Sequence, residues 1–158
     1  MPQFNEPRTA ILKTGSYSKG PGKIITMDST NNTVDLAAVS EVALGVTAGD
    51  STRDAAGALQ TAAGATVSYY PMGGVLMIQS AASQTYTLGC LVYATNSGLA
   101  TASSGSSAKV IGTFAGTADG SAAGATTALV ANGNSDTDGA LLSEGNMIAV
   151  NTNTAVSA

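Results

Sequence analysis

The chain alternates short runs of apolar or alternating residues with clusters of turn residues. Residues 23–27 (KIITM) form a β-rich apolar run, and Thr33–Ala37 alternates apolar and polar side chains as a half-buried strand does. Asp28–Thr33 lies between them and is rich in Asp and Asn, which favour turns. This pattern predicts a β-hairpin.

A second hairpin is predicted from Cys90–Ala94 and Leu99–Ala102, because Asn-Ser-Gly lies between these two runs. The start of the first hairpin matches the start of the second, since Gly22-Lys-Ile-Ile corresponds to Gly89-Cys-Leu-Val. This correspondence defines an offset along the chain (89 − 22 = 67), called the repeat offset below.

The repeat offset also relates two glycine-containing strands, which carry the sequence motif of the repeat. Gly45 corresponds to Gly112 (112 − 45 = 67), and Gly49 corresponds to Gly116 (116 − 49 = 67). Two matching blocks at a single offset indicate a duplicated β-module. Glycine inside a strand marks a bend, a bulge or a close approach of another backbone segment. We therefore expect these four glycines to have structural roles at equivalent bends in the two modules.

The remaining pattern gives further strands and loops. Strands are predicted at Thr66–Tyr70, Val75–Gln79, Thr127–Ala131 and Asn146–Val150, and loops at Ser51–Ala65 and in the Ser/Gly/Ala-rich segments. The fold class is therefore all-β, with two tandem related small β-barrel or sandwich modules. The expected division is an extended N-terminal arm (1–21), a first module (22–80) and a second module with a polar C-terminal tail (81–158).

The N-terminal arm differs in composition from the rest of the chain. It contains three of the four prolines, which argues against a helix, and we expect one short strand near Thr9–Lys13. The segment 1–23 carries a formal charge of +3 (four Lys or Arg, one Glu), and the rest carries −7. An apolar patch in such an arm docks on its own domain or on a neighbouring subunit, although a solvated arm is equally compatible with the charge. The expected contact residues for a capsid or neighbouring subunit are Phe4, Arg8, Ile11, Leu12 and Lys13.

Composition narrows the possible partners. Charged residues make up 10% of the chain, against about 25% in ordinary domains. So few charges suit a protein that lives in an assembly, and we expect a homo-oligomer, a trimer. The net charge of −4 disfavours nucleic acid, and no apolar run is long enough to span a membrane. Cys90 is the only cysteine, so an intramolecular disulfide is impossible and a reducing compartment is indicated.

Catalytic chemistry finds little support in the sequence. Histidine is absent, which excludes Ser–His and Cys–His pairs, and no phosphate-binding glycine loop or zinc pattern occurs. Asn134, Asp136 and Asp138 match the opening of a calcium loop, but its terminal acidic position is Gly145 and Glu144 falls one residue short. An ordinary turn is the favoured interpretation there, and we expect no cofactor. Scattered carboxylates leave a small hydrolase as a third, weaker hypothesis.

The two glycine strands resemble a known family. Ala43-Leu-Gly-Val-Thr-Ala-Gly49 and Val110-Ile-Gly-Thr-Phe-Ala-Gly116 look like the small β-module of tailed-bacteriophage capsid decoration (cement, head-stabilising) proteins, over about residues 22–150. The resemblance implies a non-enzymatic protein, made in the host cytoplasm, that binds the major capsid protein on the virion exterior as a trimer. The alternative is a receptor- or glycan-binding module of a phage tail or surface appendage.

Overall fold

The computed structural model describes residues 6–13, 22–28, 30–48, 66–81, 84–117 and 147–154. Within these ranges the secondary structure is β-strand, with one short 3-10 turn, η2 (Thr152–Thr154). The strands are β1 (Arg8–Ile11), β2 (Ile24–Asp28), β3 (Thr33–Leu36), β4 (Gly45–Thr47), β5 (Thr66–Pro71), β6 (Val75–Gln79), β7 (Leu91–Ala94), β8 (Ala100–Thr101), β9 (Val110–Thr117) and β10 (Met147–Asn151). The predicted strand at 127–131 and the loop at 51–65 lie outside the described residues.

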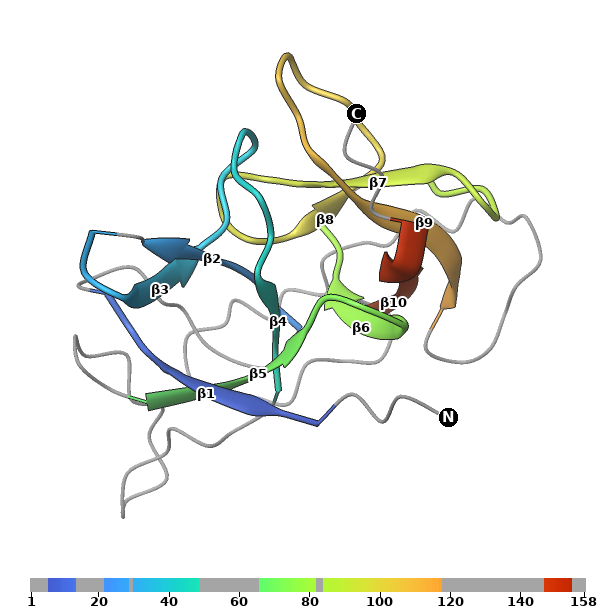
Figure 1. Cartoon of the computed structure of the whole chain (residues 1–158). Coiled ribbons are helices and arrows are strands. Elements are labelled where there is room, and N and C mark those ends of the chain that lie inside the picture. The colour runs from blue at the N-terminus through green and yellow to red at the C-terminus, as the bar shows by residue number, and fades with distance from the viewer. Residues whose placement is uncertain are drawn as a thin grey trace, which may run out of the picture.

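The strands form two five-stranded antiparallel sheets, one from each half of the chain (Figure 1). The first has the order β1-β5-β4-β2-β3, and the second has the order β6-β10-β9-β7-β8. These orders are identical once each strand of the first sheet is matched with the strand five places later. The predicted all-β fold with two related modules is confirmed.

The relation between the sheets extends to individual backbone pairs. Ile25 pairs with Gly45 in the first sheet, and Val92 pairs with Gly112 in the second. Both members of the second pair are separated from those of the first by the repeat offset (92 − 25 = 112 − 45). The predicted repeat is therefore also a repeat of strand register.

Hydrogen bonds that precede β2 and β7 repeat in the same way. The N–H of Gly22 donates to the carbonyl of Thr47 at 2.8 Å, and the N–H of Gly89 donates to that of Phe114 at 2.9 Å. Gly22 and Gly89 have nearly equal φ values of 83° and 81°. This left-handed conformation favours glycine, so the turn that leads into each central strand is built alike in both modules.

Each sheet closes on itself into a small barrel through one parallel bridge. Leu12, just after β1, bridges to Val34 in β3, and Ser80, just after β6, bridges to Ala100 in β8. The next N–H groups confirm the closure, because Lys13 donates to the Val34 carbonyl (2.9 Å) and Ala81 donates to the Ala100 carbonyl (2.8 Å). Closure removes most of the unpaired edge that an open sheet would expose.

The two sheets divide the chain at the turn 72–74, whereas the sequence suggested a boundary after residue 80. The difference arises because β6 pairs with β10, a partner near the end of the chain that local pattern does not reveal. Likewise β1, within the expected arm of residues 1–21, pairs with β5 and belongs to the first sheet.

The first barrel has its own interior, made by one buried side chain from β2, one from β3, two from β5 and Leu12. These residues are Leu12, Ile25, Val34, Val67 and Tyr69. A second, larger cluster fills the second barrel and continues into the boundary between the modules.

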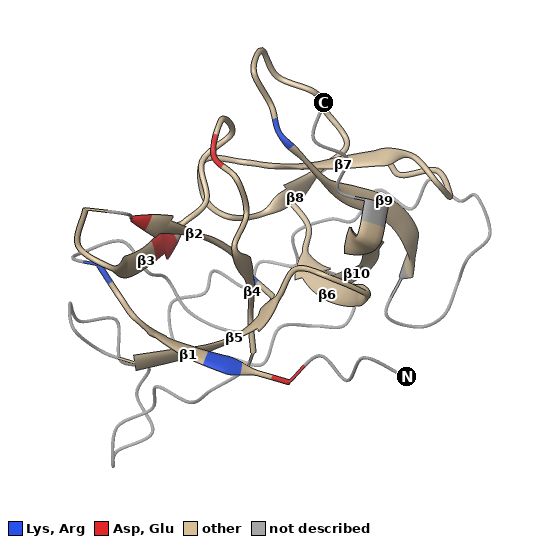
Figure 2. Cartoon of the chain, in the orientation of Figure 1, with Lys and Arg blue, Asp and Glu red and all other residues tan. Residues whose placement is uncertain are grey.

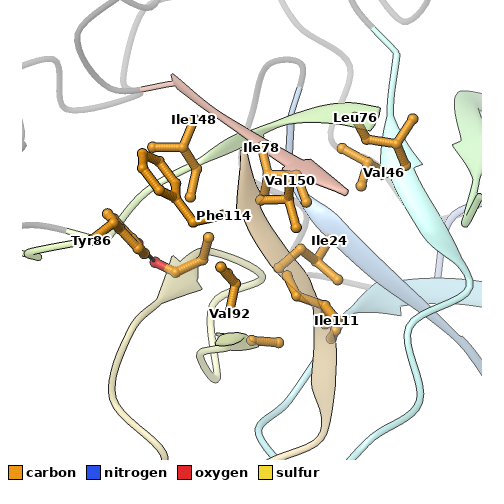
Figure 3. Packing of buried hydrophobic residues seen from close by; sticks show 13 residues of the cluster. Ile24, Val46, Leu76, Ile78, Tyr86, Val92, Ile111, Phe114, Ile148 and Val150 are labelled. Atoms are coloured by element: carbon orange, nitrogen blue, oxygen red, sulfur yellow. Dashed lines mark hydrogen bonds between the residues drawn. The ribbon is translucent and has the colours of Figure 1, made fainter. Parts of the chain in front are cut away.

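Besides Ala37, the first module enters this larger cluster through Ile24 and Val46. They are 0% and 1% exposed, and they join Leu76, Ile78 and Ile111 of the second module (Figure 3). Burying an aliphatic side chain of this size contributes roughly 1.5–3 kcal/mol, so this pair is a substantial link between the barrels. The two modules thus share one continuous core.

Backbone hydrogen bonds reinforce the boundary. The N–H of Ile24 donates to the Gly98 carbonyl at 2.8 Å, and the N–H of Gln79 donates to the Gly22 carbonyl at 2.8 Å. Gly98 is buried in the β7–β8 turn, where an added Cβ would lie 2.6 Å from the carbonyl oxygen of Ile24. The turn can therefore approach the first module only because residue 98 lacks a side chain.

Gly45 and Gly112 occupy equivalent crowded positions, as the repeat predicted. A Cβ on Gly45 would lie 2.3 Å from the carbonyl oxygen of Tyr70, and one on Gly112 would lie 2.4 Å from that of Asn151. Neither glycine has a left-handed φ, so close approach of the neighbouring strand is the reason for glycine. Gly116 has φ 136°, and Gly49 lies outside the described residues.

We expect Gly45→Ala and Gly112→Ala each to lower the free energy of unfolding by roughly 1–3 kcal/mol, because the new methyl group must displace a strand backbone. Chemical denaturation monitored by circular dichroism measures this change. Gly105→Ala is the matched control, since a Cβ there meets Val39 Cγ1 at an ordinary 3.7 Å. Equal stability of all three variants would contradict the close-approach explanation.

The turn glycine at the boundary gives a second test. Asn32, with φ 53°, stands in the β2–β3 turn where the second module has Gly98, with φ 67°. Asn32 is exposed, so Asn32→Ala should cost only left-handed strain of about 1 kcal/mol. Gly98→Ala should cost at least about 1 kcal/mol more in thermal or chemical unfolding, because its methyl group also meets the Ile24 carbonyl. Similar losses for the two variants would count against a sterically fitted boundary.

Candidate contact surfaces

The expected contact residues of the arm divide into exposed and buried ones. Arg8 and Ile11 are exposed on β1, and the side chain of Ile11 is 51% accessible. Leu12 is 1% exposed and packs inside the first barrel, so its partner is its own module. Phe4 lies outside the described residues.

Lys13 forms an ion pair that ties the end of β1 to the end of β2. Its Nζ lies 2.9 Å from Oδ2 of Asp28. Asp28 also accepts hydrogen bonds from the N–H of Thr30 and the amide of Asn31. The hydrogen bond from Lys13 is the largest cause that lowers the pKa of Asp28 to about 2, and the same contact raises the pKa of Lys13. Lys13 is therefore committed to this pair, and Arg8 is the remaining described cation of the arm.

The other carboxylates near β3 and β4 accept hydrogen bonds from nearby backbone N–H groups. Oδ1 of Asp35 accepts the N–H of Leu36 at 2.9 Å, and Oε2 of Glu41 accepts the N–H of Ala38 at 2.9 Å. Across the described ranges no group of three or more Asp, Glu, Cys or His residues is arranged to hold a metal ion. The calcium-loop candidate Asn134, Asp136 and Asp138 lies outside those ranges.

Tyr86 is a buried tyrosine, and its role is structural. Its OH donates to the Ala100 carbonyl at 2.9 Å and shares a hydrogen bond with Ser80 Oγ at 2.8 Å. Its ring stacks on Phe114 with centroids 5.1 Å apart. Burial raises the pKa of Tyr86 to about 12, so the phenol stays protonated and fastens the segment after β6 to β8.

The outer face of the second sheet carries apolar side chains that the sequence analysis did not single out. Val75 and Met77 in β6 are 60% and 38% exposed, Leu91 in β7 is 47% exposed, and Leu88 before it is 56% exposed. The sequence signal for the exposed pair in β6 is the strand's alternation, because Leu76 and Ile78, which alternate with Val75 and Met77, are buried.

The described part of this module carries very little charge. Among its described residues (75–81, 84–117 and 147–154), Lys109 is the one charged side chain, whereas the other described charges lie on the first module (Figure 2). The second module therefore presents an uncharged outer sheet face, and the first presents Arg8 on β1.

No protein-family model matches the chain, and neither the curated proteins nor the solved structures searched contain a significant match. Within the described residues, no helix has the length and apolar character needed to cross a bilayer.

The ion pair makes stability depend on acid pH in a defined direction. A lowered folded-state pKa stabilises the protein above the usual aspartate pKa of 3.8, and this contribution disappears as the pH falls toward 2. We expect the wild type to be more stable than Asp28→Asn near pH 6 and the two to converge near pH 2. Denaturant unfolding at a series of pH values measures the difference.

Lys13→Gln serves as the companion variant for this experiment. Because Lys13 is the largest cause of the lowered pKa, the pH dependence of the Asp28→Asn effect should shrink in that background. A stability difference that stays constant from neutral to acid pH would exclude the pair as its origin.

Proposed function

We propose that this chain is a structural virion protein that binds the outer surface of a phage capsid and stabilises it, without enzymatic activity. The observation that carries the proposal is the duplicated small barrel, in which the described residues of the second module carry a single charged side chain, Lys109. Its repeated glycine strands are also the stretches that resemble capsid decoration proteins. Such a protein acts by binding to a repetitive surface, and this role needs a rigid fold but no catalytic groups.

The arrangement of the polar groups supports a binding role over a catalytic one. The sequence contains no histidine, and the carboxylates of Asp28, Asp35 and Glu41 are engaged with nearby backbone N–H groups or with Lys13. Catalytic sites bring a nucleophile or base together with groups that stabilise developing charge. The polar side chains described above instead hold turns and strand ends.

On the capsid, the proposed contact is made by β1 with Arg8 as its cationic group. Arg8 is exposed, whereas Lys13 is paired with Asp28 and Leu12 is enclosed by the first barrel. An arginine fork binds carboxylates with two parallel hydrogen bonds, so an acidic surface of the major capsid protein suits this position.

Co-sedimentation with capsids of the encoding phage, assembled without this protein, tests the proposal. We expect saturable binding and a higher temperature of capsid disruption once the protein is bound. Arg8→Glu should weaken binding about tenfold or more, the change expected for reversing a charge in a close ion pair. Lys109→Glu makes the same charge change on the second module and should bind like the wild type.

Immunogold labelling of virions separates the alternatives. Label over the head supports decoration, whereas label confined to the tail would favour the receptor- or glycan-binding alternative. Absence of the protein from virions, together with no capsid binding, would overturn the proposal.

A further inference from the structure

One face of the barrel is covered in the first module and open in the second. Ile24 and Val46 point outward from the first sheet and are 0% and 1% exposed, because the second module packs over them. Their equivalents at the repeat offset are Leu91 and Thr113 (91 − 24 = 113 − 46), which pair with each other as Ile24 pairs with Val46. Leu91 is 47% exposed and Thr113 is half-buried.

The open face continues across the second sheet as one row. Thr113 pairs with Leu91 on one side and Asn151 on the other, and Asn151 pairs with Val75. Val75, at the far end of the row, is 60% exposed. We name the row Leu91, Thr113, Asn151 and Val75 the open row; it contains apolar and neutral polar residues and no charge.

The structure also shows what kind of surface covers this face. Beside Ile24, the β7–β8 turn supplies Gly98, whose carbonyl accepts the N–H of Ile24, and the end of β6 supplies Gln79, whose N–H donates to the carbonyl of the nearby Gly22. The matching bridges Leu12–Val34 and Ser80–Ala100 show that the offset is 68 at the end of β1 (80 − 12) and 66 in β3 (100 − 34). The equivalents of both parts in the first module are therefore Asn32 of the β2–β3 turn (98 − 66) and Ile11 at the end of β1 (79 − 68). In the described structure these equivalents are exposed, with Ile11 at 51%.

We propose that the open row of one chain binds the first module of a second copy of this chain, against the end of β1 and the β2–β3 turn. The contact repeats between chains the packing that joins the two modules within a chain. The β2–β3 turn carries no charge at residues 30–32, and Lys13 and Asp28 beside it form an ion pair, so the turn itself places no charge against an uncharged row. The first module's own face cannot serve, because Ile24 and Val46 are already covered.

Such a contact is head-to-tail, since it joins different surfaces of the two copies. Head-to-tail contacts generate rings when the rotation closes. The inference deepens the oligomeric part of the proposed function, on which it rests, by naming the interface. It requires no capsid, so purified protein tests it independently of capsid binding.

Analytical ultracentrifugation over a range of concentrations, with the full chain, is the test. We expect the wild type to associate, and Leu91→Lys to raise the dissociation constant about tenfold or more, as for a central apolar contact. Val42→Lys is the matched control, because Val42 is 74% exposed on the β3–β4 loop, away from the open row. Circular dichroism of each variant establishes that it is folded.

The partner surface is tested by a compensating pair. Ile11→Glu should weaken association as Leu91→Lys does, and the double variant Leu91→Lys/Ile11→Glu should regain at least part of it, because each contact then pairs opposite charges. Monomeric wild type at all concentrations, or unchanged association of folded Leu91→Lys, would overturn the proposal. Loss in Leu91→Lys without any effect of Ile11→Glu would also overturn it, since the contact would then join like faces.

Discussion

The insertion of Ile24 and Val46 into the core of the second barrel is the interaction on which the rest of the structure depends. Both side chains point outward from their own sheet, so they would be exposed apolar surface without the second module. A barrel of about 60 residues buries only some 60% of its unfolded surface and is marginal alone. Sharing one core therefore makes the two halves a single larger unit whose stability neither half would reach separately.

That shared core places a strict demand on the turns around it. The β2–β3 and β7–β8 turns both need a residue with left-handed φ, and asparagine meets that need at position 32. At position 98 the backbone also touches the Ile24 carbonyl, where an asparagine side chain would collide. The two modules thus have different residues at the turn position where the second contacts the first. They have the same residue at Gly45 and Gly112, which serve the packing within each module.

The local pattern of apolar, turn and glycine residues predicted much of this fold, because hairpins and close approaches of strands depend on residues that are near one another in the sequence. The repeat offset also predicted the matching registers of β2–β4 and β7–β9. The pairing of β1 with β5 and of β6 with β10 could not be predicted in this way, since those partners are distant in the sequence. From the sequence alone, Ile11-Leu12 is an apolar patch with no identifiable packing partner. For the same reason the arm residues were expected to act together, although folding buries Leu12, pairs Lys13 and leaves Arg8 and Ile11 exposed.

The tandem arrangement of two like modules has an unavoidable geometric consequence. When two like modules pack through different faces, one module's face is consumed and the equivalent face of the other remains available. Leu91 and Ile24 look alike in the sequence, and only the covering of Ile24 distinguishes them. An uncharged face of this kind gains nothing from long-range attraction, so its binding should depend on shape and apolar contact and respond weakly to salt. The exposed Arg8 offers the opposite behaviour, because charge attraction to an acidic partner weakens as salt rises.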